Sequence, residues 1–440
     1  MFLRFPLSEL LSLFFLLQSS DIQDSILFYR AYDAYNLENF EEAEGTLLRH
    51  LISYPDSRYN AKTLFLLADI NFKTGRYQKV IEYCLSLIKK YPDFDTAIHV
   101  LLMMGDAYFN LQRFTSAKQV YKRLKKLPLP PEILQRVDLR IHEIAYYEGK
   151  FSSLTDALRD FIETYVDTTK SGGIISETML RIARLHMEKK EYYSALSMLK
   201  RLKTTYPESH LLPEVLFEES RINKYLGNVE EYKNSLSLIV TNWNKHPLFP
   251  SALIELATSY QEEQKFDSSL YYWTLLKNIS GYQDLALKGI ADIYYKINFY
   301  DEAIVVLQTL IKEFPESKLT AEAYLLWAEI LKSQGEDSKA IDILNELSKK
   351  SDLKPEIFVK LGEMYYKLND YQDALRCYLK ASENYKEQRD EAARALIKAG
   401  DVAKAMGDKV GAKRYYLNAR QFAQSVEIKH LAAIKINEVD

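Results

Sequence analysis

The chain has 440 residues, and 58 basic against 61 acidic side chains give a formal net charge of -3. This balance argues against a nucleic-acid-binding protein, because proteins that hold phosphates carry a strong excess or a long stripe of basic residues. Only 14 Gly and 12 Pro are present, which disfavours turn-rich sheets and long disordered linkers, so an all-α fold is predicted.

Residues 1–20 resemble a secretory signal peptide. Arg4 gives a basic start, residues 10–17 form an apolar run, and residues 18–20 are polar. The run is apolar on every side, unlike an ordinary amphipathic helix, so we expect export of the chain. The alternative is a capping helix over the first repeat of a cytoplasmic protein, since Glu9 borders the run. No cysteine follows the run, which excludes a bacterial lipoprotein anchor.

A short pattern, usually opening with an aromatic residue and closing with a small one, recurs along the chain, most often every 37 residues. Its eleven copies end at Ala43, Val80, Ala117, Leu154, Ala195, Tyr232, Ser269, Ala303, Ala340, Ala374 and Ala412. Twelve residues before this position ten of the eleven units carry a small residue, and four residues after it all carry an uncharged one, mostly large. The spacing predicts two amphipathic helices per unit, which approach closely at the small residue.

Proline-containing junctions separate the units. Tyr54-Pro55-Asp56-Ser57 is the first, and similar segments lie at 91–94, 206–209 and 314–317. Proline cannot continue a helix, whereas Asp, Glu and Ser favour the start of the next one. Each unit is therefore predicted to be a helix, a tight turn, a second helix and a break.

The recurring pattern resembles the tetratricopeptide repeat over about residues 24–424. The tenth unit matches it well, with Leu361-Gly362, Tyr365, Tyr371, Ala374, Tyr378 and Tyr385. The resemblance implies an all-α, right-handed α-solenoid of about eleven helical hairpins with a C-terminal capping helix. The fourth, sixth and ninth units are weaker copies, either degenerate repeats or unrelated helical hairpins.

Two irregular segments divide this array. Residues 167–175 include the only Gly-Gly of the chain, and we expect a loop or hinge there, between units 1–4 (24–166) and units 5–11 (176–424). Residues 425–440 alternate apolar and charged side chains, which predicts the capping helix.

The resemblance implies that the first helix of each unit lines a long concave groove that holds peptides or protein surfaces. In units 1–4 two positions of this face carry Tyr32, Tyr35, Asp69, Phe72, Asp106, Phe109, Glu143 and Tyr146. Aromatic rings beside carboxylates suit a segment with apolar and basic side chains. The alternative is that the aromatic residues simply pack between adjacent first helices.

Three basic residues of units 5 and 6, Arg184, Arg221 and Lys224, form a secondary patch on the same predicted face. They would suit an acidic segment, although solvated charge on a helix face is the simpler interpretation. The family's clamp of Lys, Asn and Arg around a terminal carboxylate is not reproduced.

Sequence motifs of catalysis are missing: there is no Gly-rich phosphate loop, His-Glu-x-x-His, Cys-x-x-Cys or Gly-x-Ser-x-Gly. His142 and His186 stand at apolar repeat positions and are predicted to lie in the core, as are Cys84 and Cys377. We therefore predict no catalytic residue, no cofactor, no metal site and no small-molecule substrate.

The spacing, the junctions and the N-terminal segment together resemble periplasmic repeat proteins of bacteria, such as the helical lipoprotein of the outer-membrane barrel-assembly machinery and the coordinator of the Tol-Pal system. The resemblance implies a non-catalytic scaffold of the bacterial cell envelope that binds protein or peptide partners, in a periplasmic or outer-membrane complex. The alternatives are a structural subunit packed by its outer surface into a larger assembly, and a cytoplasmic adaptor.

Overall fold

The computed structural model describes residues 20–94, 97–165, 173–349, 353–385 and 388–439, and in these ranges every regular element is an α-helix. The chain forms two compact units, residues 1–215 and 216–440, with the boundary inside α12 (Leu212–Leu226). Residues 1–19 of the predicted signal peptide and most of the predicted loop at 167–175 lie outside the described residues. No helix in the described ranges is long and apolar enough to cross a membrane.

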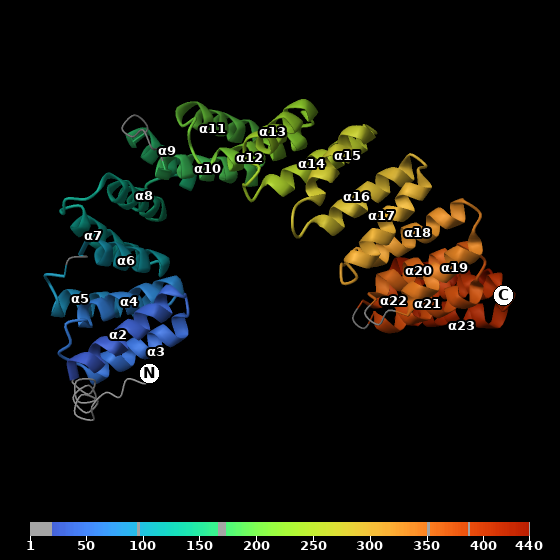
Figure 1. Ribbon diagram of the computed structural model, residues 1–440, viewed down its shortest axis with the longest axis horizontal. Coiled ribbons are helices and arrows are strands. Elements are labelled where there is room, and N and C mark those ends of the chain that lie inside the picture. Colours follow the sequence, from blue (N-terminus) through green and yellow to red (C-terminus); the bar gives the residue numbers. More distant parts are fainter. Residues whose placement is uncertain (1–19, 95–96, 166–172, 350–352, 386–387, 440) are drawn as a thin grey trace, which may run out of the picture. The chain divides into compact units, whose positions relative to one another are not determined.

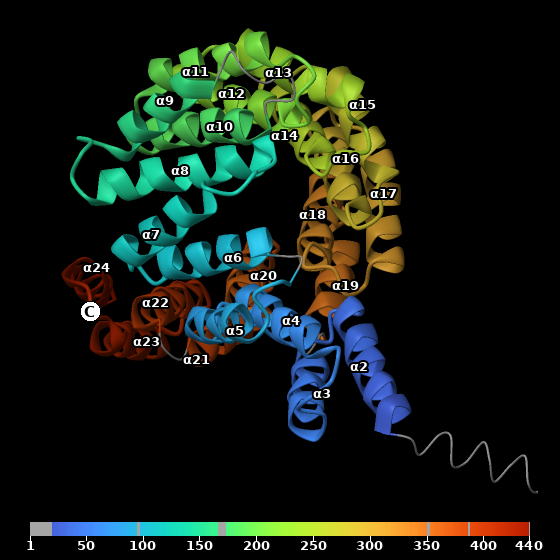
Figure 2. The same ribbon diagram turned by 90° about the vertical axis from the view of Figure 1, so that its left-hand side faces the viewer.

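The first unit contains five helical hairpins, each built from a first and a second helix (Figure 1). The pairs are α2 (Ser20–Asn36) with α3 (Phe40–Ser53), α4 (Asn60–Lys73) with α5 (Tyr77–Lys90), α6 (Ala97–Asn110) with α7 (Phe114–Leu124), α8 (Pro131–Tyr147) with α9 (Leu154–Tyr165), and α10 (Gly173–Glu188) with α11 (Tyr192–Thr205). First helices of successive hairpins also touch, as α4 does α6 and α8 does α10 (Figure 2). These first helices define the first-helix face of the unit.

The second unit continues the same order of elements. After α13 (Val229–Asn242) come the pairs α14 (Phe249–Glu262) with α15 (Phe266–Lys277), α16 (Gln283–Lys296) with α17 (Tyr300–Glu313), α18 (Thr320–Ser333) with α19 (Asp337–Ser348), α20 (Pro355–Lys367) with α21 (Tyr371–Asn384), and α22 (Arg389–Ala405) with α23 (Lys409–Phe422). The last helix, α24 (Val426–Asn437), packs against α22 and α23. The predicted all-α repeat with a capping helix is confirmed, and the weak fourth and ninth units form hairpins like the others.

In the described residues, a left-handed residue lies in the turn of each of these ten pairs and in the turn between α12 and α13, which makes eleven turns. Their φ angles are between 57° and 84°, at Glu38, Gly75, Gln112, Gly149, Lys190, Gly227, Gln264, Asn298, Gly335, Asn369 and Gly407. Glycine adopts this conformation without steric strain, whereas the other side chains adopt it at a cost in free energy. The turns repeat with the spacing of the sequence pattern, so the period reflects one recurring turn geometry per unit.

The predicted pairing of small and large residues forms the core of the hairpins. Tyr121 of α7 is completely buried, and a Cβ atom on Gly105 of α6 would lie 2.5 Å from its Cε1 atom. Gly362 and Gly400 face Tyr378 and Tyr416 in the same way. Where the large residue of a unit is Tyr, the small one is Gly, because the ring occupies the space of a methyl group.

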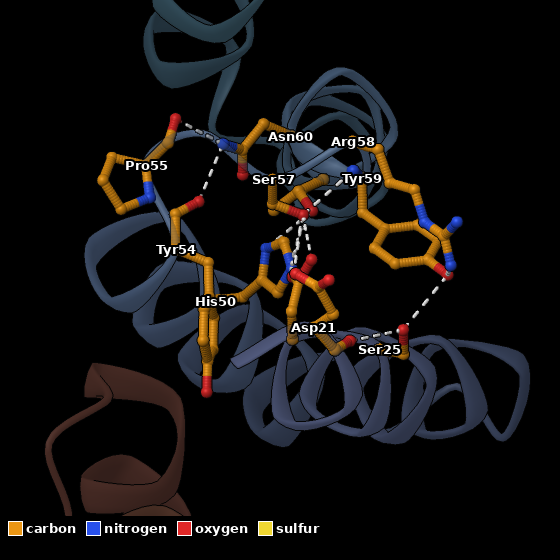
Figure 3. A network of polar contacts seen from close by, with 11 residues as sticks. Asp21, Ser25, His50, Tyr54, Pro55, Ser57, Arg58, Tyr59 and Asn60 are labelled. Atoms are coloured by element: carbon orange, nitrogen blue, oxygen red, sulfur yellow. Dashed lines mark hydrogen bonds and ion pairs between the residues drawn. The ribbon is translucent and has the colours of Figure 1, made fainter. Parts of the chain in front are cut away.

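The proline junctions are held by a recurrent serine. In Figure 3, Ser57 lies close to the His50 ring, to the right of Pro55. Its Oγ donates to the Asp24 carboxylate of α2, with oxygens 2.7 and 2.8 Å away. The same Oγ accepts a hydrogen bond from the backbone N–H of Tyr59, 3.0 Å away. Ser317 repeats this arrangement, donating to Asp284 at 2.5 Å and accepting from Leu319 N–H at 3.1 Å. The junction serine thus joins the start of one hairpin to the first helix of the preceding hairpin.

Candidate protein-binding surface

Four of the five aromatic residues predicted for the groove are half-buried in the hairpins of the first unit: Tyr35, Phe72, Phe109 and Tyr146. Each of the first three packs against the aromatic residue that opens the second helix of its own hairpin: the ring centroids are 6.2 Å apart for Tyr35 and Phe40, and 5.7 Å for Phe72 and Tyr77 and for Phe109 and Phe114. Tyr146 contacts Tyr147 at 5.2 Å. These contacts lie at the hairpin turns. Phe109 also packs against Tyr147 of the next first helix, α8, with ring centroids 6.2 Å apart, which is the kind of contact that the alternative of packing between first helices expected. Their role in binding stays a prediction.

Tyr32 and Asp69 lie at the N-terminal part of this face. The Tyr32 ring is 40% exposed and stacks between Phe28 and Tyr35. Tyr35 Oη donates to Asp69 Oδ2 at 2.6 Å, and Lys73 Nζ lies 2.8 Å from the same hydroxyl and 2.9 Å from the carboxylate. Burial, and then the hydrogen bond to Asp69, raise the pKa of Tyr35 above its usual value. The Asp69 carboxylate is therefore partly neutralised by its own chain.

Asp106 is almost completely covered by side chains of its neighbours. It is 1% exposed, and its Oδ1 accepts the buried Tyr121 hydroxyl at 2.6 Å. Arg136 Nη2 donates to its Oδ2 at 2.5 Å, and Arg140 Nε lies 3.5 Å from its Oδ1. Burial, and then the Asp106 charge, raise the pKa of Tyr121 above its usual value. The two arginines belong to the next first helix, so they cover the acid from outside.

Glu143 of α8 repeats this arrangement one hairpin further along the face. It is also 1% exposed, and it accepts from Arg140 Nη1 at 2.7 Å and from Arg181 of α10. The structure therefore changes the expected role of these two acids. They are covered by arginines, and the face of α6, α8 and α10 presents guanidinium groups where sequence analysis expected carboxylates.

Arg136, Arg140 and Arg181 were not among the residues predicted from the sequence. A usable signal was present, because units 4, 5, 10 and 11 carry a basic residue three positions before the predicted acidic register: Arg140, Arg181, Lys360 and Lys398. A base at this position reaches an acid of the preceding first helix in all four of these units. Arg140 reaches Asp106, Arg181 reaches Glu143, Lys360 reaches Glu322 and Lys398 reaches Glu363.

The predicted basic patch is distributed over both compact units. Arg184 lies on α10 of the first unit, one helical turn beyond Arg181, and is exposed. Arg221 and Lys224 lie on α12 in the second unit, where Arg221 pairs with Glu218 at 2.7 Å and Lys224 with Glu255 at 2.7 Å. The last two side chains are thus engaged in ion pairs within their own unit.

A hollow of about 620 Å³ opens on the first helices near the end of the second unit. It is lined by Tyr366, Tyr378, Lys398, Asp401, Val402, Lys404, Ala405 and Lys435. Lys435 of the capping helix pairs with Asp401 at 2.9 Å, and Lys404 pairs with Glu438 at 2.9 Å. The same register that suggested the groove in units 1–4 supplies Tyr366 and Lys404 here, whereas Lys435 follows only from the packing of α24.

Ser57, His50 and Asp24 lie together at the first junction but do not form an activated nucleophile. His50 is completely buried, and its Nε2 lies 2.6 Å from Asp24 Oδ1, while its Nδ1 lies 3.1 Å from Thr63 Oγ1 (Figure 3). A catalytic serine donates to the histidine, with the acid on the other ring nitrogen. Here the Ser57 hydroxyl donates to Asp24, so the cluster connects the first junction to α2.

The buried cysteines and one of the two predicted core histidines occupy core positions. Cys84 and Cys377 belong to hydrophobic clusters, and burial raises the pKa of each thiol to about 12. His186 is 8% exposed and bonds Glu191, whereas His142 is half-buried and lies 2.7 Å from the Asp138 carbonyl oxygen. Within the described ranges no three His, Cys, Asp or Glu side chains are placed to hold a metal ion.

Comparison with known protein families identifies tetratricopeptide repeats in this chain. Models of the tetratricopeptide repeat match residues 28–93, 99–128, 177–209, 286–317 and 358–392. The matches lie in both compact units and follow the hairpins described above. No curated protein matches the sequence.

The chain is also similar to several solved structures, each at low sequence identity. A tetratricopeptide repeat protein from Parabacteroides merdae is 17% identical, with 60% of this chain and 100% of that chain covered and a TM-score of 0.40. Yeast Tom70 is 16% identical, with 96% of both chains covered and a TM-score of 0.33. The APC/C hetero-tetramer Cut9-Hcn1 is 15% identical, with 97% of this chain and 92% of that chain covered and a TM-score of 0.32.

Proposed function

We propose that this protein is a non-catalytic scaffold of the bacterial cell envelope, which binds protein or peptide partners through the first-helix face. The observation that supports it most is the arrangement of Asp106, Glu143 and their arginines. Charged side chains on three successive first helices are held by ion pairs between hairpins, and the arginines of these pairs are partly exposed. A preorganised polar surface of this kind loses little side-chain entropy when a partner binds.

Affinity purification of the tagged full chain from its native host tests the binding surface. Arg184→Glu alters the first-helix face, and Lys200→Glu, an exposed position on the second helix α11, is the matched control. We expect a partner that is retained by the wild type and by Lys200→Glu and is reduced by Arg184→Glu. Equal retention by all three proteins would contradict a first-helix site.

The envelope location is supported by residues 1–20, whose basic start, apolar run and polar exit are typical of an export signal. The N-terminal mass of the mature protein and its distribution between periplasm and cytosol provide the test. Loss of about twenty residues with periplasmic recovery is the expected result. Recovery of a protein with an intact Met1 from the cytosol would contradict the envelope location and favour a cytoplasmic adaptor with the same binding surface.

A second candidate is a structural subunit packed by its outer surface. It is favoured by large apolar side chains that stand exposed on second helices, such as Tyr193 on α11, Tyr271 on α15 and Val305 on α17. This candidate predicts self-association or dependence on a partner for folding, and sedimentation of the purified chain separates it from a monomeric scaffold.

A further inference from the structure

We propose that Arg136, Arg140 and Arg181 form a binding site for anionic side chains of a partner protein, and that the buried carboxylates of Asp106 and Glu143 hold these arginines in position. The proposal rests on the proposed scaffold function and names the chemistry of the segment that the face recognises. The charge of the bound segment is therefore opposite to the one expected from the sequence, where the acidic residues suggested a partner with basic side chains.

Each of the three arginines has one end fixed and the other accessible. The side chains of Arg136 and Arg181 are 47% and 45% exposed, and that of Arg140 is 28% exposed, whereas both carboxylates beneath them are almost completely buried. The Arg140 guanidinium also lies 4.6 Å from the centroid of the Phe109 ring. The rotamers are therefore set by the protein before a ligand arrives.

The three guanidinium groups are more exposed than the two carboxylates that they contact. Three guanidinium groups face two carboxylates, and the carboxylates lie below them, so an incoming group meets the cations first. Each guanidinium carries five N–H donors in a planar fork. The hydrogen bonds from Arg136, Arg140 and Arg181 within the described residues use only a few of these donors. The remaining donors match the paired oxygens of a carboxylate or a phosphate.

The fold itself does not require a buried acid at this register. Thr258 occupies the equivalent position on α14, where the hairpin forms in the same way. Burying a carboxylate costs free energy, which the attraction of one arginine roughly offsets. Packing alone therefore does not account for two buried acids paired with three arginines. We infer that the acids hold the guanidinium groups in position.

Binding of labelled synthetic peptides to the purified full chain tests the site by fluorescence anisotropy. The probes alternate leucine with glutamate, with glutamine, with lysine or with phosphoserine. Arg136→Gln and Arg181→Gln each remove one cation from the face. Arg201→Gln is the matched control, because Arg201 of α11 forms a similar inter-hairpin pair with Glu163 of α9, at 2.6 and 3.1 Å, on second helices.

We expect the glutamate peptide to bind the wild type, and each face variant to weaken it by about tenfold, as for a charge-assisted pair. Arg201→Gln should change it by less than about twofold, because that pair is on the second helices. If the phosphoserine peptide binds more tightly and is lost with the same variants, the recognised anion is a phosphorylated side chain. Circular dichroism and thermal midpoints show whether each variant is folded.

Any of three results would overturn the site. One is binding of the glutamate peptide that Arg136→Gln and Arg181→Gln leave unchanged. Another is equal or tighter binding of the glutamine or lysine peptide. The third is no binding of any anionic peptide. A neutral or basic peptide that binds the first-helix face would leave the scaffold function standing without the anion site.

Discussion

At the scale of single residues, the pairing of glycine with tyrosine across a hairpin shows how closely sequence pattern and packing are linked. Gly105, Gly362 and Gly400 each lie so close to a tyrosine ring that an added Cβ atom would overlap it. Repeats with alanine at this position carry Leu, Cys or Trp opposite, as in Ala31 and Leu47. In the three tyrosine units a methyl group on the small residue would overlap the ring, so glycine is required there.

Replacing Gly105 by Ala should destabilise the third hairpin by about 1–3 kcal/mol, because the methyl group overlaps Tyr121. Gly45→Ala is the matched control, since Gly45 lies on α3 where an added methyl group would have no neighbouring atom within 4 Å. There the change should stabilise by about 0.5–1 kcal/mol, because alanine favours a helix. Thermal unfolding measures both, and equal effects of the two changes would contradict the packing argument.

The two buried thiols predict a loss of stability in alkaline solution. Burial raises the pKa of Cys84 and Cys377 from 9.0 to about 12. Between these values the unfolded chain has released a proton that the folded chain still binds, so the free energy of unfolding falls as pH rises through this window. Below about pH 9 both states are protonated and the contribution is constant.

Thermal midpoints measured from about pH 8 to about pH 11 should fall less steeply for a Cys84→Ala, Cys377→Ala variant than for the wild type. Native thiols should also resist modification until the chain unfolds. Identical slopes, or rapid modification of the folded protein, would contradict burial of these groups.

The core positions could be predicted from the sequence, but the burial of Asp106 and Glu143 could not. The burial of the small and large residues can be predicted from their spacing, because helix geometry places them on one face. By contrast, Arg136 lies 30 residues after Asp106 and Arg181 lies 38 residues after Glu143. Whether these arginines cover the acids depends on how neighbouring first helices pack, which a periodic pattern does not specify.

At the scale of elements, the hairpin turn is the unit that repeats most faithfully. All eleven turns use one left-handed residue, occupied by Gly in five hairpins and by Asn, Gln, Lys or Glu in the other six. The sequence pattern predicted where the turns lie, because aromatic and small residues flank them. It did not reveal the left-handed position, since glycine is absent from more than half of the turns.

Gln264→Gly should stabilise the protein by about 1 kcal/mol, because glycine adopts the φ of 60° without the strain that a side chain introduces. Gly335→Ala, the reciprocal change at φ 79°, should destabilise by about 1 kcal/mol, although no atom lies near the added methyl. Chemical denaturation measures both. The same sign for the two variants would show that backbone conformation is not the cause.

At the scale of the whole molecule, the contacts of each hairpin are made almost entirely with its neighbours. The two compact units, residues 1–215 and 216–440, each contain their own hydrophobic clusters. In such chains stability is close to a sum over hairpins and their interfaces. The hinge expected at 167–175 stays a prediction, since residues 166–172 lie outside the described ranges.

Leu47→Ala should therefore act locally. Leu47 is completely buried in the first hairpin, and its truncation should cost about 2–5 kcal/mol, whereas Leu48→Ala, at an exposed position, should cost little. Amide hydrogen exchange should show lost protection in α2 to α5 and unchanged protection in α20 to α23. A uniform loss along the chain would contradict nearest-neighbour stability.

Site-specific photo-cross-linking in the native host tests most directly whether partners bind the first-helix face. Benzoylphenylalanine replaces Tyr147, which is 51% exposed on the first helix α8, or Tyr193, which is 78% exposed on the second helix α11. We predict a discrete protein adduct from position 147 and none from position 193. Adducts from position 193 alone would contradict a first-helix scaffold and indicate a subunit packed by its outer surface.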